Sequence, residues 1–337
     1  VGGPAFVLIG AVIGAVTPWF WPILAATFIV GVGDSLWALG REVAGIDLVR
    51  TDQRGRVLSG FHGMHSGALA IGPLIGGVLA DGVGFRATFA GFAALTTLAV
   101  VLGLFSHDAR PTRAAGQPSG TASEGRAVSR WLRGMIALFA QIDPTLRMTY
   151  WVFVFATFAG FTFRITLQSV MPLYADEALG LSSTEIGALF SISGGVVFAM
   201  IIPAGFVLDK LGRKWATVPS TFLPGVAFLL VPFADSFTQL SVLIGFMAVA
   251  NGLSLGSLAA STYDVLPTNV RGRLQAFRRT AAEVGGVSAP LVGGLLVDTV
   301  GPAAPFIAYA PILLIGGLLL AFVARETLVR QSNRDDG

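Results

Sequence analysis

The sequence has no cysteine and few charged residues, and both shortages limit what the protein can be. Without cysteine the chain forms no disulfide, performs no thiol chemistry and offers no Cys-ligated metal site. Three histidines are too few for an ordinary metal cluster, so we expect no metal and no cofactor. Only 12% of the 337 residues are charged, whereas a soluble domain carries about 25%. A chain with so little polar surface is predicted to face lipid.

Long apolar runs fill the rest of the chain, which is 54% hydrophobic. A helix needs about 20 apolar residues to cross the hydrocarbon core of a bilayer. The 43 glycines and 17 prolines fall largely inside the apolar runs, where close helix packing and helix breaks require them. The fold class predicted is therefore an all-α integral membrane protein with about ten transmembrane helices, at residues 3–17, 23–41, 57–80, 86–105, 149–172, 184–208, 215–234, 239–263, 273–297 and 303–324.

The charged residues of the loops alternate in sign along the chain. Every second loop is basic, and these loops hold Arg50, Arg54, Arg56, Arg110, Arg113, Arg126, Arg130, Arg133, Lys210, Arg213, Lys214, Arg271, Arg273, Arg325, Arg330 and Arg334. The loops between them are acidic apart from Arg86, and they hold Asp81, Asp176, Glu177, Asp235 and Asp298. Because basic loops stay in the cytoplasm, this alternation predicts a multi-pass protein of the plasma membrane with the basic loops inside.

The longest polar stretch is 106–147. Its first part, Arg110 to Gly125, has the Gly, Ser, Pro and Ala content of a flexible linker. Its second part, Arg126 to Gln141, alternates arginine with apolar residues at helical spacing, which favours an interfacial amphipathic helix over a disordered linker. The predicted domains are an N-terminal bundle at 1–105, a cytoplasmic linker at 106–147, a C-terminal bundle at 148–325 and a cytoplasmic tail at 326–337.

The two halves of the chain repeat each other. Arg54-Gly55-Arg56 recurs 217 residues later as Arg271-Gly272-Arg273, and the same offset pairs Pro73 with Pro290, Gly76 with Gly293, Gly77 with Gly294, and Asp81 with Asp298. Parallel repeats of this kind are a transporter architecture. The second half begins near Tyr150, whose counterpart would precede Val1 by about 70 residues, or two spans. We therefore expect the visible spans to be helices 3–12 of a six-plus-six protein; a natural ten-helix protein is the alternative.

One loop carries a family resemblance. Gly205-Phe-Val-Leu-Asp209-Lys210-Leu-Gly212-Arg213-Lys214 resembles the cytoplasmic G-x-x-x-D-[RK]-x-G-[RK]-[RK] loop of the major facilitator superfamily. The resemblance implies a transporter of two helical bundles that works by alternating access. Gly205 permits close packing, Gly212 permits a turn, and Asp209 can pair with a cation or a helix N-terminus. We interpret the loop as a gate on one membrane face, and a simple positive-inside anchor is the alternative.

A second motif resembles the end of the family's antiporter motif. It is Gly72-Pro73-Leu74-Ile75-Gly76-Gly77, in which proline permits a bend and glycines bring backbones together. Because Pro290, Gly293 and Gly294 repeat it in the second half, a structural helix-packing role is as well supported as an antiport role. A third motif departs from the family: Thr27 stands where drug antiporters commonly carry arginine, although Gly31 and Gly33 match.

Polar residues inside the spans are candidates for the transport site, because ionisable groups in a bilayer cost several kcal/mol. Asp34 lies about 18 Å into its helix, Arg164 lies well inside the seventh, and Asn251 is the repeat partner of Asp34. The resemblance implies that these helices line the central cavity. We expect Asp34 or Glu283 to take a proton and Arg164 to hold a substrate group.

Structural roles remain open for some of these residues. Glu283 and Arg279 stand at i, i+4 and can simply neutralise each other, and Asp34 can pair with Arg41. His62 and His65 share a helix face and can relay protons, although packing in a wet vestibule is the plainer interpretation.

The residues thus predict a secondary active transporter, with proton-coupled efflux of a small organic compound favoured. Uptake by proton symport and a non-transporting membrane receptor or scaffold are the alternatives. No H-E-x-x-H or G-x-S-x-G motif occurs, so we expect no enzyme and no catalytic residues. The expected partners are the lipid bilayer, a small-molecule substrate and the proton as coupling ion. We expect a monomer that binds no nucleic acid.

Overall fold

A computed structural model gives the fold of most of the chain. It describes residues 2–47, 54–105, 138–254, 257–267 and 269–326, without the side chains of residues 39, 41–63, 66 and 209. The predicted amphipathic helix lies outside the described residues except for its last four positions, and so does the tail beyond Glu326.

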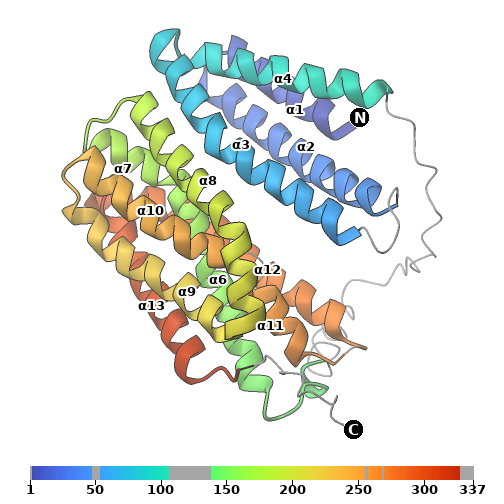
Figure 1. Cartoon of the computed structure of the whole chain (residues 1–337). Helices are drawn as coiled ribbons and strands as arrows, with labels where there is room; N and C mark the ends of the chain where they lie inside the picture. Colours follow the sequence, from blue (N-terminus) through green and yellow to red (C-terminus); the bar gives the residue numbers. More distant parts are fainter. Residues whose placement is uncertain (1, 48–53, 106–137, 255–256, 268, 327–337) are drawn as a thin grey trace, which may run out of the picture. The chain divides into compact units, whose positions relative to one another are not determined.

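The regular elements in the described ranges are all helices (Figure 1). A backbone inside lipid must satisfy its own hydrogen bonds, and a helix does so within one segment. The elements are α1 (Gly2–Val16), α2 (Phe20–Asp47), α3 (Arg54–Gly82), α4 (Phe85–Phe105), α6 (Arg147–Ser169), α7 (Met171–Glu177), α8 (Ser183–Phe206), η1 (Val207–Leu211), α9 (Arg213–Leu230), η2 (Val231–Phe233), α10 (Phe237–Ser254), α11 (Ser257–Val265), α12 (Arg271–Val300) and α13 (Ala304–Phe322).

The helices agree with the predicted spans, and the prediction of an all-α membrane protein is confirmed. Among the described residues, 8 helical segments are long and apolar enough to cross a membrane. Two further apolar helices, Gly2–Val16 and Gly67–Gly82, are shorter. The main difference from the prediction is at the fifth span, where α6 ends at Ser169 and α7 continues to Glu177. Pro172, near the start of α7, has no N–H to extend the ladder of α6.

The chain forms two compact units. Among the described residues, unit 1 contains 2–47, 54–105 and 182–191, and unit 2 contains 138–181, 192–254, 257–267 and 269–326. The first residues of α8 are therefore grouped with α1 to α4. The predicted domain boundaries, at 105, 147 and 325, remain a prediction.

Small residues bring α1 and α2 together in unit 1. A Cβ on Gly3 would lie 2.6 Å from the backbone nitrogen of Trp37, and one on Gly33 would lie 2.8 Å from that of Val7. These distances leave no room for a side chain, so the glycines let the two backbones touch. Gly33, which the sequence marked as part of a family motif, thus has a packing role.

A second close contact in unit 1 joins α3 to the start of α8. Gly77 lies against Ser183, and Gly187 lies against the carbonyl group of Pro73. The Asp81 carboxylate accepts hydrogen bonds from the backbone N–H groups of Ser183 at 3.1 Å and Thr184 at 2.7 Å. Asp81 therefore satisfies two of the N–H groups that the first turn of α8 leaves without helical partners.

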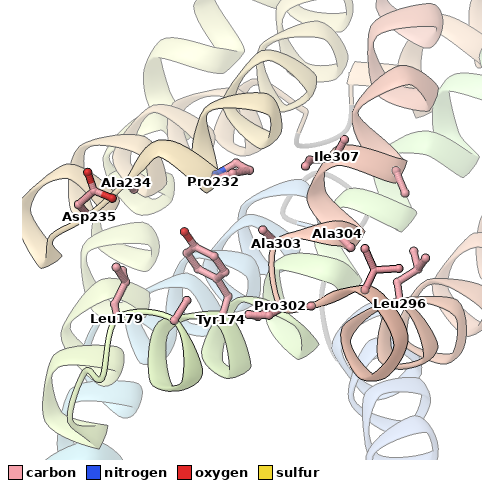
Figure 2. Close-up of a pocket in the computed structure, with 14 residues that line it drawn as sticks. Tyr174, Leu179, Pro232, Ala234, Asp235, Leu296, Pro302, Ala303, Ala304 and Ile307 are labelled. Atoms are coloured by element: carbon pink, nitrogen blue, oxygen red, sulfur yellow. The ribbon is translucent and has the colours of Figure 1, made fainter.

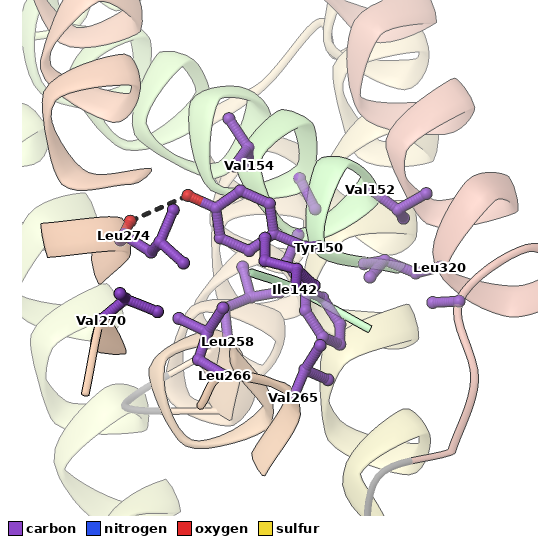
Figure 3. Close-up of a cluster of buried hydrophobic side chains, with 13 residues drawn as sticks. Ile142, Tyr150, Val152, Val154, Leu258, Val265, Leu266, Val270, Leu274 and Leu320 are labelled. Atoms are coloured by element: carbon purple, nitrogen blue, oxygen red, sulfur yellow. Dashed lines mark hydrogen bonds between the residues drawn. The ribbon is translucent and has the colours of Figure 1, made fainter. Parts of the chain in front are cut away.

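The core of unit 2 gathers around Tyr150 (Figure 3). Its ring is fully buried, and its hydroxyl donates a hydrogen bond of 2.9 Å to the carbonyl oxygen of Leu274. The other members are apolar side chains of α6, α11, α12, α13 and the segments beside them: Ile142, Val152, Phe153, Val154, Ala156, Leu258, Val265, Leu266, Val270, Leu274, Leu320 and Ala324. This cluster holds the first turns of α6 and α12 at the same level.

Candidate functional site

Helices α6 and α12 lie side by side in unit 2 and run in the same direction. Tyr150 contacts Leu274, Thr157 contacts Arg278, and Val170 lies against Gly293, so the contacts advance together along both helices. A Cβ on Gly285 would lie 2.8 Å from the carbonyl oxygen of Phe158, which shows how closely the backbones approach. At this interface the polar side chains of Thr157 and Arg278 meet.

Arg278 is the polar residue that ties the pair together, and the sequence reasoning missed it. Its Nη1 donates a hydrogen bond of 2.8 Å to the hydroxyl of Thr157 on α6, and its Nε donates one of 2.8 Å to Oε1 of Gln275. The half-buried guanidinium is thus held by two neutral acceptors. The rule that selected Arg164 and Glu283 as ionisable groups inside spans applies equally to Arg278, so the signal was present in the sequence.

Glu283 lies between two arginines. Its carboxylate is 3.8 Å from Nε of Arg279, one helical turn earlier. It also acts electrostatically on Arg164 of α6, whose guanidinium carbon lies 5.7 Å from the centre of the Phe161 ring. The side chains of Arg279 and Glu283 are 79% and 56% exposed. The predicted Arg279–Glu283 pair therefore forms, but it is an exposed pair that leaves the carboxylate accessible to protons.

Taken together, α6 and α12 carry a row of polar groups that begins at their interface, where Arg278 meets Thr157, and continues beside it in the exposed side chains of Arg279, Glu283 and Arg164. At about 1.5 Å per residue, Arg278 lies about 10 Å and Glu283 about 18 Å from the start of α12. Exposed ionisable groups inside a membrane span face water or a cavity, because lipid would penalise each of them by several kcal/mol. This row can bind a polar substrate group and exchange a proton, which are the two operations a coupled carrier needs.

The other predicted site residues lie elsewhere. Asp34 is exposed on α2 of unit 1, and among the described side chains none forms a hydrogen bond or ion pair with it. Asn251 lies half-buried near the end of α10, where it accepts hydrogen bonds from Ser254 Oγ, at 2.7 Å to its carbonyl oxygen and 3.4 Å to Oδ1. No described contact joins Asn251 to Arg164. The repeat relation to Asp34, which selected Asn251 from the sequence, therefore does not place Asn251 in the polar row of α6 and α12. His65 is exposed on α3, and the side chain of His62 lies outside the described part.

The predicted gating loop is a tight turn between α8 and α9. Gly205 lies in the last turn of α8, residues Val207–Leu211 form a π-helical turn, and Gly212 has a φ of 133°, which favours glycine. Lys210 is exposed, while the side chain of Asp209 lies outside the described part, so its predicted pairing stays a prediction.

Two acids that sequence reasoning did not select fasten this loop. Nε of Arg213 lies 3.1 Å from the Asp264 carboxylate. The Glu326 carboxylate accepts hydrogen bonds from the backbone N–H groups of Arg213 and Lys214, at 3.0 Å and 3.2 Å. It thereby caps the N-terminus of α9, where a negative charge is favourable. The loop is anchored to both α11 and the segment after α13.

The glycines of the two helix-packing motifs differ in how closely their neighbours approach. Gly77 and Gly293 lie at close helix contacts, and a Cβ on Gly76 would meet Thr88 at 3.6 Å, an ordinary distance. Gly72 and Gly294 have open space where a Cβ would stand, so the described contacts do not require glycine there. Pro73 and Pro290 both lie inside helices, as predicted for positions that permit a bend.

A separate pocket of about 660 Å³ opens at the other end of unit 2 (Figure 2). It lies where α7 ends, α10 begins and α12 leads into α13, and most of its lining is alanine, proline, leucine and valine. Asp235 and Tyr174 are its polar side chains, and the Tyr174 hydroxyl already donates to the carbonyl oxygen of Val231 at 2.9 Å. None of the predicted site residues lines this pocket.

Comparison with known protein families shows which family the chain belongs to. The profile described as Major Facilitator Superfamily matches residues 1–155 and 153–336, which together cover nearly the whole chain. The chain belongs to the Major Facilitator Superfamily. This is a family of transporters rather than enzymes, in agreement with the sequence prediction.

Curated relatives of this superfamily member have different names. It is 27% identical to a probable sulfoacetate transporter, SauU, of Cupriavidus necator over 54% of the chain and 42% of that protein. It is 28% identical to the multidrug resistance protein MdtG of Dickeya zeae over 80% of the chain and 62% of that protein. The matches thus span about two fifths to three fifths of these relatives' own length.

A solved structure supports the fold. The crystal structure of a POT family transporter in complex with a thioalcohol-conjugated peptide matches 95% of this chain and 80% of that chain, with a TM-score of 0.72 and 14% identity. At this identity the likeness shows a shared fold alone. The superfamily member is accordingly a multi-pass membrane protein, as its helices indicate.

Proposed function

We propose that this chain is a secondary active transporter that moves a small organic compound by alternating access, coupled to protons. The observation that carries the proposal is the exposed Glu283 carboxylate on a membrane-spanning helix, with Arg279 beside it and Arg164 across the helix interface. Membership of a transporter family supports the same function. We place the basic loops in the cytoplasm and the chain in the plasma membrane, on the sign of the loop charges.

The charges on α6 and α12 favour binding the proton and the substrate together. While Glu283 is ionised, its charge neutralises part of the charge of Arg164. A proton on Glu283 removes that charge and leaves Arg164 to bind an acceptor group of the substrate. Because a carrier must bind its ligands differently in its two states, this exchange is the step that alternating access can use. We therefore propose proton symport as the first mode of coupling.

Proton-coupled efflux is the second candidate, and the relatives support it. Several proteins named multidrug resistance protein MdtG are similar to this chain, and the one from Dickeya zeae matches 80% of it. The names of other relatives include sulfoacetate and cis,cis-muconate transport, so the relatives do not agree on one cargo. In an efflux carrier Asp34 of α2 would be the second proton-binding candidate.

Flux through the reconstituted full chain tests the proposed function. Liposomes with a pH-sensitive dye inside would receive a panel of small organic acids, amides and amines under an imposed pH gradient. We expect compound-dependent proton movement, reduced at least tenfold in Arg164→Ala and uncoupled from the gradient in Glu283→Gln. Asp34→Asn distinguishes proton-coupled efflux from symport, because only the efflux scheme requires the carboxylate of Asp34.

The matched control is Asp298→Asn, which removes an exposed acid from the same helix as Glu283. We expect it to transport like the parent chain. Wild-type coupled flux in both Arg164→Ala and Glu283→Gln would remove these residues from the site. Absence of flux for every compound would instead favour the non-transporting receptor or scaffold.

A further inference from the structure

We infer that the substrate is a small organic anion, bound between Arg164 and Arg278 on helices α6 and α12. The inference rests on the proposed function, and it adds the chemical class of the cargo and a second binding residue. The observations that carry it are the surplus of positive charge on this helix pair and the neutral hydrogen-bond acceptors of Arg278.

The helix pair has more cations than its acids can neutralise. Beyond their first turns, the inner parts of α6 and α12 carry Arg164, Arg278 and Arg279, and Glu283 is the acid among them. One carboxylate can balance one guanidinium. Positive charge without a partner is unfavourable inside a membrane, so a protein that keeps it there needs an anion to complete the site.

Arg278 has the geometry of a binding residue rather than of an ion pair. Its two hydrogen bonds go to an amide oxygen and a hydroxyl, so they orient the guanidinium without neutralising it. Gln275 is itself fixed, because its Nε2 donates to the carbonyl oxygen of Ala259 at 3.2 Å. The Nη2 group of Arg278 has no hydrogen-bond partner among the described residues. With Nε and one N–H of Nη1 engaged, Nη1 and Nη2 still present N–H groups at the end of the guanidinium, where a carboxylate or sulfonate can bind at two points.

The two arginines are spaced for a short molecule. Arg278 contacts α6 at Thr157, and Arg164 follows Thr157 by seven residues, or about 10 Å along the helix. Both side chains are long, so they can converge on one molecule from its two ends. A compact organic anion with an anionic group near Arg278 and a second acceptor near Arg164 fits this separation.

Glu283 then links the anion to the proton. A substrate anion beside Arg164 repels the ionised carboxylate of Glu283 and favours its protonated form, since like charges raise a carboxylate's affinity for protons. By reciprocity, protonation of Glu283 strengthens the binding of the anion. Proton and anion binding are therefore expected to be mutually favourable, which is the requirement for symport.

Ligands of similar size and different charge test whether the substrate is an anion. The purified full chain would be exposed to succinate, to the neutral isostere succinamide and to 1,4-diaminobutane, together with a wider set of carboxylates and sulfonates and their amides. Binding is read by thermal shift and flux by the dye assay, at pH 5.5 and 7.5. We expect members of the anion set to bind at least tenfold more tightly than their amides, with tighter binding at the lower pH.

Variants of the site provide the second arm. Arg278→Gln and Arg164→Gln should each weaken anion binding at least tenfold, and Arg278→Lys should restore part of it. Arg273→Gln, which removes an exposed arginine from the same helix five residues earlier, should leave anion binding unchanged.

Different results overturn different claims. Equal or tighter binding and flux of amides or amines would overturn the anion assignment while supporting a transporter. Unchanged anion binding in both Arg278→Gln and Arg164→Gln would also overturn it. Anion binding without any flux would retain the binding site and overturn the transport function.

Discussion

At the scale of single residues, the hydrogen bonds of Arg278 decide how the site works. Thr157 accepts from Arg278 and at the same time donates to the carbonyl oxygen of Phe153 at 2.6 Å. Its hydroxyl is therefore fixed in one orientation, with a lone pair toward the guanidinium. A threonine in this position preorganises Arg278, so substrate binding does not have to supply the free energy of orienting the guanidinium.

Replacing Thr157 tests this preorganisation. Thr157→Val keeps the shape of the side chain and removes the acceptor of a charge-assisted hydrogen bond, which typically contributes about 1.5–3 kcal/mol. We expect the apparent affinity for substrate to fall by about tenfold or more, with little change in the maximal rate. Thr97→Val is the control, because Thr97 also donates to the carbonyl four residues earlier but contacts no described arginine. Equal effects in the two variants would contradict the role of Thr157.

Asp143, just before α6, gives a pH-dependent prediction outside the membrane spans. The N–H of Thr145 donates to its carboxylate at 2.8 Å and the Thr145 hydroxyl does the same, and these bonds lower the pKa of Asp143. A carboxyl group with a lowered pKa stabilises the fold above its unfolded pKa of about 3.9, and that contribution is lost as the pH falls through the folded value.

The prediction concerns the thermal unfolding midpoint in detergent. Asp143→Ala should unfold at a lower temperature than the parent chain at pH 7, and the difference should shrink as the pH falls below about 4. Asp176→Ala, which changes an exposed acid after α6, serves as control. A difference for Asp143→Ala that stayed constant down to pH 3 would contradict the assigned hydrogen bonds.

At the scale of elements, the pairing of α6 with α12 depends on where the glycines lie. Gly285 stands where the two backbones approach closely, whereas a Cβ on its neighbour Gly286 would lie 3.5 Å from the side chain of Ile165, an ordinary contact distance. Two adjacent glycines on one helix thus have different roles. The difference depends on the helix that lies opposite, which the sequence does not specify.

This contrast gives a matched pair of substitutions. In Gly285→Ala the new Cβ would meet the carbonyl oxygen of Phe158 at 2.8 Å and Thr162 Oγ1 at 2.9 Å, so the helices must separate. Overpacking of this kind costs about 1–3 kcal/mol. Unfolding in denaturant should show that loss for Gly285→Ala and little change for Gly286→Ala. If both variants were equally stable, the close packing of α6 against α12 would be wrong.

The element scale also shows what the sequence could and could not predict. Hydropathy predicted the helices because the length of a span is set by the bilayer and not by its neighbours. The same reasoning selected Asp34, Glu283 and Arg164 as charges inside spans, and helical spacing added Arg279 as the partner of Glu283. It could not predict that Asp81 caps α8 or that Glu326 caps α9, because those contacts join residues far apart in the chain.

At the scale of the whole molecule, the sequence repeat, the positive-inside pattern and the family resemblance of the loop at 205–214 together predicted a two-bundle transporter, and the comparison confirms that the chain belongs to a transporter family. The repeat was less informative about function. It paired Asn251 with Asp34, yet the polar row of unit 2 lies on α6 and α12. Two halves with the same architecture can carry different chemistry, because packing positions repeat while the polar residues of a site need not.

The central claim is that the polar face of α6 and α12 borders water inside the membrane. The chain has no cysteine, so single cysteines can be labelled without a background. In native membranes, a charged methanethiosulfonate reagent should modify Glu283→Cys rapidly and Ile315→Cys, an exposed apolar position on α13, at least tenfold more slowly. Equal labelling of the two positions, or slower labelling at 283, would contradict a water-filled transport path along α6 and α12.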